Sequence, residues 1–389
     1  MTVTMSSWPP MLWPEDELIL RLAGTRRKRA TSVRRVERLI GEAEPAVLER
    51  RMDALRLTGV VGRRVLEVPS ATPGVELAGH VSAWLEGHRA RSQVYALTLR
   101  SVCDRLEDAG VPALPLKGQD LALRIHGDLG ARPSADIDVL VAADQLPAAV
   151  EVLAAIGYRP SARADEPWLL ELHHEVIHAG SGMPPVELHR RVEWYDGEAF
   201  AAAVLRRSAR SPGALRRAAP ADELAILLLI FARDGFAGLR LPADIAAWWD
   251  RYGGELAPRA LEPIAEAHPS LARALATAAV VAERLVALPA SDLLKIDSAG
   301  GRRSRLAARL ADPLLQRGWP EATLVDGLLS DGPALRAWAR RRVLPPRGHV
   351  AFTHGLRPTL TVRIAALQAT QPLRVGARLA WAALGARRS

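Results

Sequence analysis

The sequence predicts an α+β protein in which a central unit of strands and helices lies between N-terminal helices and a C-terminal all-helical domain. Apolar residues recur at helical spacing from Glu15 to about Glu67. Between residues 111 and 192 the pattern changes to short, partly alternating apolar runs, and from about Ala199 helical Ala/Leu/Arg segments return. We expect three parts in the 389 residues: 1–79, 80–198 and 199–389.

The N-terminal part reads as a small helical region. Its last stretch, Val60 to Val68 with Gly62 inside, predicts a short hairpin, which would make a winged-helix DNA-binding domain an alternative for this region. Pro69 to Gly79 is typical of a linker. A long helix is expected from about His80 to Ala109, where Gly110 ends it.

The central part predicts strands separated by helices. Asp144 is expected to cap a helix that Gly157 ends. A Gly- and Pro-rich turn at 180–185 is expected to join the last two strands. The expected strands are Val111–Leu116, Asp136–Val141, Leu172–Ala179 and Val186–Val192, and Gln119–Ile125 is an expected helix.

The C-terminal part predicts helices at Glu223–Asp234, Pro242–Tyr252 and Leu271–Leu288. Its most apolar run, Leu224 to Ala232, is about half of the roughly 20 residues that a membrane helix needs, so no membrane span is expected. The first residues lack the pattern of a signal peptide. We therefore expect a cytoplasmic protein.

Charge and cysteine content exclude some classes of site. The net charge is +9, but the arginines are spread among acids and do not form one basic tract that would indicate nucleic acid. Lysine occurs only at Lys28, Lys117 and Lys295, which makes each position informative. Cys103 is the only cysteine, so an internal disulfide and a multi-cysteine metal site are excluded.

Two aspartates begin the second predicted strand. Because side chains alternate along a strand, Asp136 and Asp138 point to the same side, with Cα atoms roughly 7 Å apart. Two like charges at the start of an apolar strand need a positive partner, and hard oxygen ligands suit a divalent ion such as Mg²⁺. The pair predicts a metal site.

A second motif lies upstream, where a strand runs through Lys117 and Gly118 directly into a helix. The glycine lets the backbone approach a ligand, and the helix N-terminus offers free amides to a phosphate. Lys117 adds a positive charge. Arg132, in the loop before the aspartates, adds a guanidinium group that can donate two parallel hydrogen bonds to a phosphate. This segment predicts a phosphate-binding site.

A third carboxylate is expected from another strand, because two-metal phosphoryl transfer needs ligands for both ions. In the sequence Val186-Glu187-Leu188-His189, the apolar pair faces the core, and Glu187 shares the other side with His189. Glu187 is the predicted ligand. His189 is an accessory candidate, since a histidine on a sheet more often orients a neighbour than binds a metal.

These residues resemble a known family. Leu116-Lys117-Gly118, the run from Arg132 through Asp136-Ile137-Asp138 to Val141, and Val186-Glu187-Leu188-His189 together are similar to the uncharacterised nucleotidyltransferase family within the DNA polymerase β-like superfamily. The resemblance covers about residues 45–330. It implies a polymerase β-like mixed sheet with helices.

The resemblance also implies an activity and its site. It implies Mg²⁺ (or Mn²⁺) bound by Asp136, Asp138 and Glu187, with an NTP as substrate. The reaction would move a nucleoside monophosphate to a hydroxyl or amine of an unidentified small-molecule, peptide, protein or RNA acceptor and release pyrophosphate. The predicted nucleotide-binding residues are Lys117, Gly118, Gln119 and Arg132.

Two other readings stay open. The chain departs from the superfamily pattern where Lys117-Gly118-Gln119 replaces the usual Gly-Ser pair, so a catalytically degenerate adaptor with an Arg-rich surface is one alternative. The other is a zinc metallopeptidase through His174-Glu175-Val176-Ile177-His178, a motif that acts from a helix. Val176-Ile177 favour a strand here.

Overall fold

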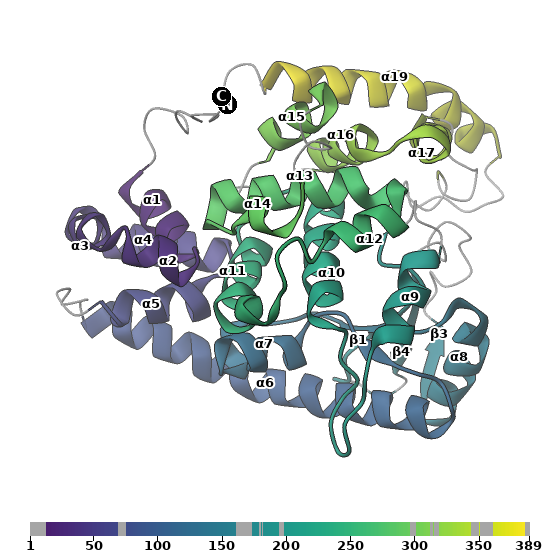
Figure 1. The fold of residues 1–389 in the computed structure, drawn as a ribbon, viewed down its shortest axis with the longest axis horizontal. Helices are drawn as coiled ribbons and strands as arrows, with labels where there is room; N and C mark the ends of the chain where they lie inside the picture. Colours follow the sequence, from purple (N-terminus) through teal and green to yellow (C-terminus); the bar gives the residue numbers. More distant parts are fainter. Residues whose placement is uncertain are drawn as a thin grey trace.

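The structure is a computed structural model that describes residues 13–68, 75–160, 173–178, 180, 182–193, 198–295, 301–311, 314, 319–343, 350 and 361–385. Helices surround one mixed five-stranded sheet (Figure 1). The predicted α+β class is confirmed. The boundaries expected near residues 79 and 198 stay predictions.

Short helices form the N-terminal part. They are α1 (Pro14–Leu22), α2 (Arg26–Ala30), α3 (Val33–Glu42), α4 (Pro45–Ala54), the π-helix η1 (Thr58–Gly62) and α5 (Arg63–Leu66). The predicted hairpin over Val60 to Val68 is wrong, because this segment is helical. The winged-helix alternative, which required that hairpin, is therefore also wrong. Val61 and Val65 lie inside the N-terminal helical cluster, and a Cβ on Gly59 would come 2.6 Å from the Cα of Ala131. Glycine therefore permits a close helical contact here.

Helix α6 (Val75–Asp108) joins the N-terminal helices to the sheet. Its first half packs into the N-terminal cluster through Leu77, Val81 and Leu85, and its second half packs under the sheet. The predicted helix began five residues too late, but its end at Gly110, whose φ is +78°, is confirmed. One long helix thus supports both parts.

The sheet has the order β1-β2-β5-β4-β3, with β2 and β5 parallel and the other pairs antiparallel. Its strands are β1 (Leu114–Pro115), β2 (Ile137–Leu140), β3 (Tyr158–Pro160), β4 (His173–His178) and β5 (Val186–His189). Strands were expected at four of these places, and β1, β2 and β5 are shorter than predicted. β3 was not expected.

The two sides of the sheet differ. Ile137, Val139, Val186 and Leu188 are buried in one cluster with α6 and α8 (Leu146–Ala155). Because side chains alternate along β2 and β5, the intervening residues are turned away from this core. The prediction that Asp144 caps this helix is wrong, because a 3-10 turn (Ala143–Gln145) precedes α8 and makes Gln145 its N-cap.

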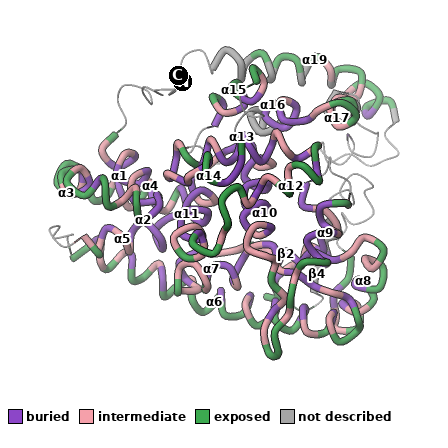
Figure 2. Tube along the Cα trace, viewed as in Figure 1, coloured by how far each residue is buried: buried purple, intermediate pink, exposed green. Residues whose placement is uncertain are grey.

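The C-terminal helices contain the largest apolar cluster. Its buried residues lie where α10, α11 and α13 meet (Figure 2). The helices are α9 (Ala199–Arg207), α10 (Pro220–Arg233), α11 (Arg240–Tyr252), α12 (Glu262–Ala267), α13 (Pro269–Val286), α14 (Ala290–Leu293), α15 (Arg302–Arg309), α16 (Trp319–Leu329), α17 (Gly332–Val343) and α19 (Thr361–Gly385). Leu114 and Leu140 of the sheet join this cluster, which fixes the helices against the sheet. Among the described helices, none has the length and apolar character to span a bilayer.

Candidate active site

Strand β2 fixes the two predicted aspartates. Asp138 lies inside the strand between Ile137 and Val139, whose side chains anchor the backbone in the core, and its own carboxylate is buried. Asp136 is half-buried just before the strand, and the hydroxyl of Ser134 donates to its Oδ1 at 3.4 Å. Burial, together with the charge of Asp138, raises the pKa of Asp136.

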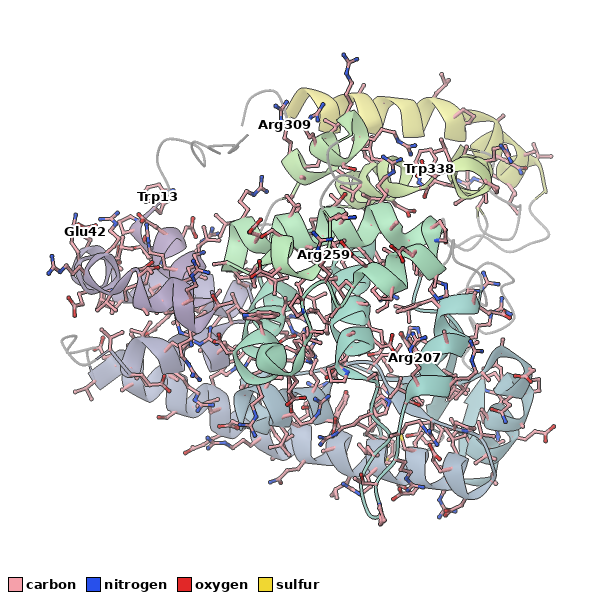
Figure 3. The ribbon with its side chains drawn as sticks, viewed as in Figure 1. Trp13, Glu42, Arg207, Arg259, Arg309 and Trp338 are labelled. Carbon is pink, nitrogen blue, oxygen red and sulfur yellow. The ribbon has the colours of Figure 1, made fainter. Side chains whose placement is uncertain are left out.

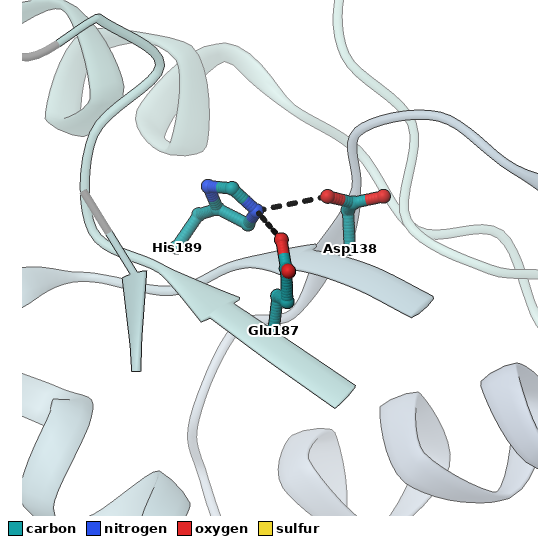
Figure 4. Close-up of side chains that lie close together, drawn as sticks. All are labelled: Asp138, Glu187 and His189. Carbon is teal, nitrogen blue, oxygen red and sulfur yellow. Dashed lines mark hydrogen bonds and ion pairs between the residues drawn. The ribbon is translucent and has the colours of Figure 1, made fainter. Parts of the chain in front are cut away.

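Strand β5 brings Glu187 and His189 to the aspartates. β5 is parallel to β2 with Glu187 opposite Asp138, so the two carboxylates extend from the same side of neighbouring strands. The imidazole Nε2 of His189 lies 2.9 Å from Asp138 Oδ1 and 3.4 Å from Glu187 Oε2 (Figure 4). The structure therefore brings Asp138, Glu187 and His189 together.

Lys117 lies on the other oxygen of Asp138, with its Nζ 3.0 Å from Oδ2. Burial alone would raise the pKa of Asp138, but the charge of Lys117 and the hydrogen bond from His189 outweigh it and hold that pKa below its ordinary value. Burial would likewise lower the pKa of His189, but its two carboxylate partners raise it. The charge of Lys117 thus offsets part of the negative charge of the acids at this site.

The Lys117–Gly118 turn adopts the conformation that the sequence indicated. Gly118 has φ +93° and ψ −141°, which only glycine adopts without strain, and α7 (Gln119–His126) begins at the next residue. Gln119 is buried, and within the described part of the chain neither its Oε1 nor its Nε2 has a hydrogen-bond partner. Such buried polar atoms call for a ligand or water.

Arg132 is turned toward the C-terminal helices. Its Nε donates to Asp244 Oδ2 of α11 at 2.5 Å, and His126 Nε2 lies 2.9 Å from the other oxygen of Asp244. Arg240, also on α11, donates to the carbonyl of Pro133. The role of Arg132 in nucleotide binding stays a prediction, but the structure also gives this arginine a structural partner.

Sequence patterns alone did not point to Asp244, because its partners lie more than a hundred residues away in the chain. A local signal was present, since this aspartate is the one acid in the buried apolar run from Ala243 to Ala247. A buried acid in such a run needs a cationic partner. Asp244 therefore anchors the loop that precedes Asp136.

The residues fit a divalent metal ion. One ligand atom from each of Asp138, Glu187 and His189 lies within 4.8 Å of the others, and Asp136 lies just before strand β2 outside this group. The Glu187 side chain is 22% exposed, while those of Asp138 and His189 are buried, so an ion can reach the group from the Glu187 side. Hard carboxylate oxygens predominate in the group.

The competing zinc motif falls on strand β4, which spans His173–His178. A helical turn is needed to bring its two histidines and its glutamate to one metal ion. The strand does not provide that spacing, so the peptidase reading loses its geometric basis.

Comparison with known proteins gives one match. The family model described as "Uncharacterised nucleotidyltransferase" matches residues 42–287, which is more than half of the chain. The matched segment includes β2, β5, the Lys117–Gly118 turn and α11. Neither the search of curated proteins nor the search of solved structures gives a match.

Proposed function

Because the chain belongs to the uncharacterised nucleotidyltransferase family, we propose that it transfers a nucleoside monophosphate from an NTP to a hydroxyl or amine of an acceptor by a two-metal mechanism. The observation that supports this most is the convergence of Asp138 and Glu187 on neighbouring strands, with Asp136 beside them. Three carboxylates at one place suit a pair of Mg²⁺ or Mn²⁺ ions.

Each part of the site has a separate task in this proposal. Asp136, Asp138 and Glu187 hold the ions, and Gly118 lets the N-terminus of α7 approach the triphosphate. Lys117 is close enough to the carboxylates to bind phosphate oxygens that the ions also bind. When bound, divalent ions neutralise the triphosphate and make the acceptor group a better nucleophile.

The chemistry is a displacement at the α-phosphorus. The acceptor oxygen or nitrogen forms a bond to this phosphorus, the bond to the bridging oxygen of the β-phosphate breaks, and pyrophosphate leaves. The proton of the acceptor passes to a carboxylate or to solvent. The protein contributes position and charge, which supply most of the rate in phosphoryl transfer. The acceptor and the cytoplasmic location stay predictions.

The test is transfer of label from each α-³²P-labelled NTP, with Mg²⁺ or Mn²⁺ and cell extract as the acceptor source. Wild type is compared with the Asp136→Ala/Asp138→Ala variant. Transfer by wild type alone supports the proposal, whereas equal transfer by both proteins would remove these aspartates from the mechanism. Salt-dependent binding of RNA or DNA without NTP binding would favour the adaptor alternative.

We expect Lys117→Ala to weaken NTP binding by about 10-fold or more, because a charge-assisted hydrogen bond contributes about 1.5–3 kcal/mol. The protein should still fold, since His189 still contacts the buried carboxylate of Asp138 when the ammonium is removed, so the effect on unfolding should be smaller than the effect on NTP binding. Calorimetric titration with NTP and Mg²⁺, together with thermal unfolding, measures both effects. Lys295→Ala, at an exposed lysine after α14, is the control. Equal NTP affinity in the two variants would contradict the prediction.

A further inference from the structure

We infer that His189 is itself a metal ligand, and that Asp138, Glu187 and His189 form a mixed nitrogen and oxygen site that prefers a first-row transition ion such as Mn²⁺ to Mg²⁺. This inference rests on the proposed function, because it names the metal specificity of the same site. It also revises the sequence-based expectation that His189 only orients a neighbour.

The first support is geometric. Two neighbouring ligands of a six-coordinate ion with bonds of about 2.1 Å lie about 3.0 Å apart. His189 Nε2 lies 2.9 Å from Asp138 Oδ1 and 3.4 Å from Glu187 Oε2. Figure 4 shows the same ring nitrogen directed at both carboxylates. These separations match ligands on adjacent positions around one ion, so only small side-chain movements are needed to bind it.

The second support is the rigidity of the three positions. Asp138 lies in β2, while Glu187 and His189 lie in β5, and the two strands are joined by the parallel ladder. His189 is fully buried, so its ring has little freedom to turn away from the carboxylates. A ligand set carried by strands holds its geometry better than one carried by loops. The nitrogen ligand is therefore preorganised.

The third support is the placement of charge. Lys117 contacts Oδ2 of Asp138, and His189 contacts Oδ1, so the ammonium and the imidazole lie on different oxygens of one carboxylate. An ion held by His189 Nε2 and Oδ1 would therefore use the oxygen that Lys117 does not contact. The metal and the lysine that the proposed function assigns to phosphate do not compete for the same carboxylate oxygen.

The preference among metals follows from the ligand types. Mg²⁺ takes oxygen ligands and gives up its water reluctantly, whereas imidazole nitrogen suits first-row transition ions. A site of two carboxylates and one buried imidazole therefore gains more from Mn²⁺ than from Mg²⁺. A purely carboxylate site would not make this distinction to the same extent.

Pulsed EPR spectroscopy of the wild-type protein with Mn²⁺ tests the ligand directly. A coordinated imidazole gives a ¹⁴N coupling to bound Mn²⁺, and incorporation of ¹⁵N-labelled histidine must replace it with the ¹⁵N coupling. This measurement needs no substitution and therefore does not depend on the folding of a variant. Bound Mn²⁺ without histidine coupling would overturn the inference, as would the absence of Mn²⁺ binding.

The specificity is tested with His189→Gln. We expect Mn²⁺ binding to weaken by about 10-fold or more, and Mg²⁺ binding by less than about threefold. His126→Gln is the matched control, since this buried histidine also places Nε2 2.9 Å from an aspartate oxygen but belongs to the Asp244 group. Equal losses for both metals in His189→Gln would contradict the inference.

Failure of the inference is distinguishable from failure of the proposed function. Nucleotide transfer by a protein whose Mn²⁺ shows no histidine coupling would leave the function standing and remove His189 from the metal. A histidine-coupled Mn²⁺ in a protein that neither binds NTP nor transfers label would support the metal site and contradict the nucleotidyltransfer.

Discussion

Replacing Asp138 with asparagine is expected to lower the rate of nucleotide transfer by about 10³-fold or more, because charge stabilisation by a bound metal contributes several kcal/mol to the transition state. Asp138 contacts both His189 and Lys117, so it connects the metal ligands to the phosphate-binding turn. The amide keeps the shape of the side chain but loses its charge. Radiolabel transfer under single-turnover conditions measures the effect.

The folded state should survive this change. Lys117 is partly exposed and can be hydrated, so its charge is not left uncompensated in the core after the substitution. Asp144→Asn is the matched control, since this exposed aspartate follows the same strand at its other end and should retain full activity. Asp138→Asn with wild-type transfer and an unchanged fold would exclude a metal held by this carboxylate.

Local patterns were enough to predict the parts of the site that lie within single strands. Alternation alone put Asp138 on the opposite side from Ile137 and Val139, and Glu187 on the same side as His189. That period depends only on the strand backbone. The Lys117–Gly118 turn could also be predicted from local sequence, because a glycine between a strand and a helix indicates a backbone conformation that other residues adopt only with strain. The residue sets on β2 and β5 could therefore be listed before the structure was known.

Interactions across the chain could not be predicted in the same way. Nothing near Lys117 in sequence shows that its ammonium contacts Asp138, and nothing near Arg132 shows that its guanidinium meets α11. The wrong hairpin at Val60 to Val68 has a similar cause. Its valines suit either a strand or a helix. The segment is helical where Gly59 packs closely against Ala131 and where Val61 and Val65 are buried in the N-terminal cluster. Tertiary packing decides such ambiguous segments.

The buried charge group at α11 carries the largest expected effect on stability. Asp244 accepts from Arg132 and contacts His126. Burial alone would raise the pKa of Asp244, but the charge of Arg132 and the hydrogen bond with His126 outweigh it and hold that pKa below its ordinary value. Its charge therefore stabilises the fold above about pH 4, and this contribution is lost as the pH falls further. At pH 7, Asp244→Asn removes the charge and leaves Arg132 buried without a counter-ion.

We expect Asp244→Asn to lower the free energy of unfolding by about 3–5 kcal/mol, as measured by urea denaturation at pH 7. Asp222→Asn is the control. Asp222 is equally buried, but its partner Arg207 on α9 is 47% exposed (Figure 3) and can be hydrated, so a loss of about 1 kcal/mol is expected. Equal losses of unfolding free energy in the two variants would show that burial of the cation does not affect the cost of removing its carboxylate partner.

A second substitution distinguishes the cost of leaving Arg132 buried without its carboxylate partner from the cost of losing the contact between Arg132 and Asp244. In Asp244→Asn/Arg132→Met the buried cation is also removed, so stability should recover in part, because an apolar replacement avoids the cost of an uncompensated charge. Activity should not recover, since Arg132 and Pro133 lie in the loop that α11 holds just before Asp136. Recovery of nucleotide transfer in the double variant would mean that the metal-binding strand needs no support from the C-terminal helices.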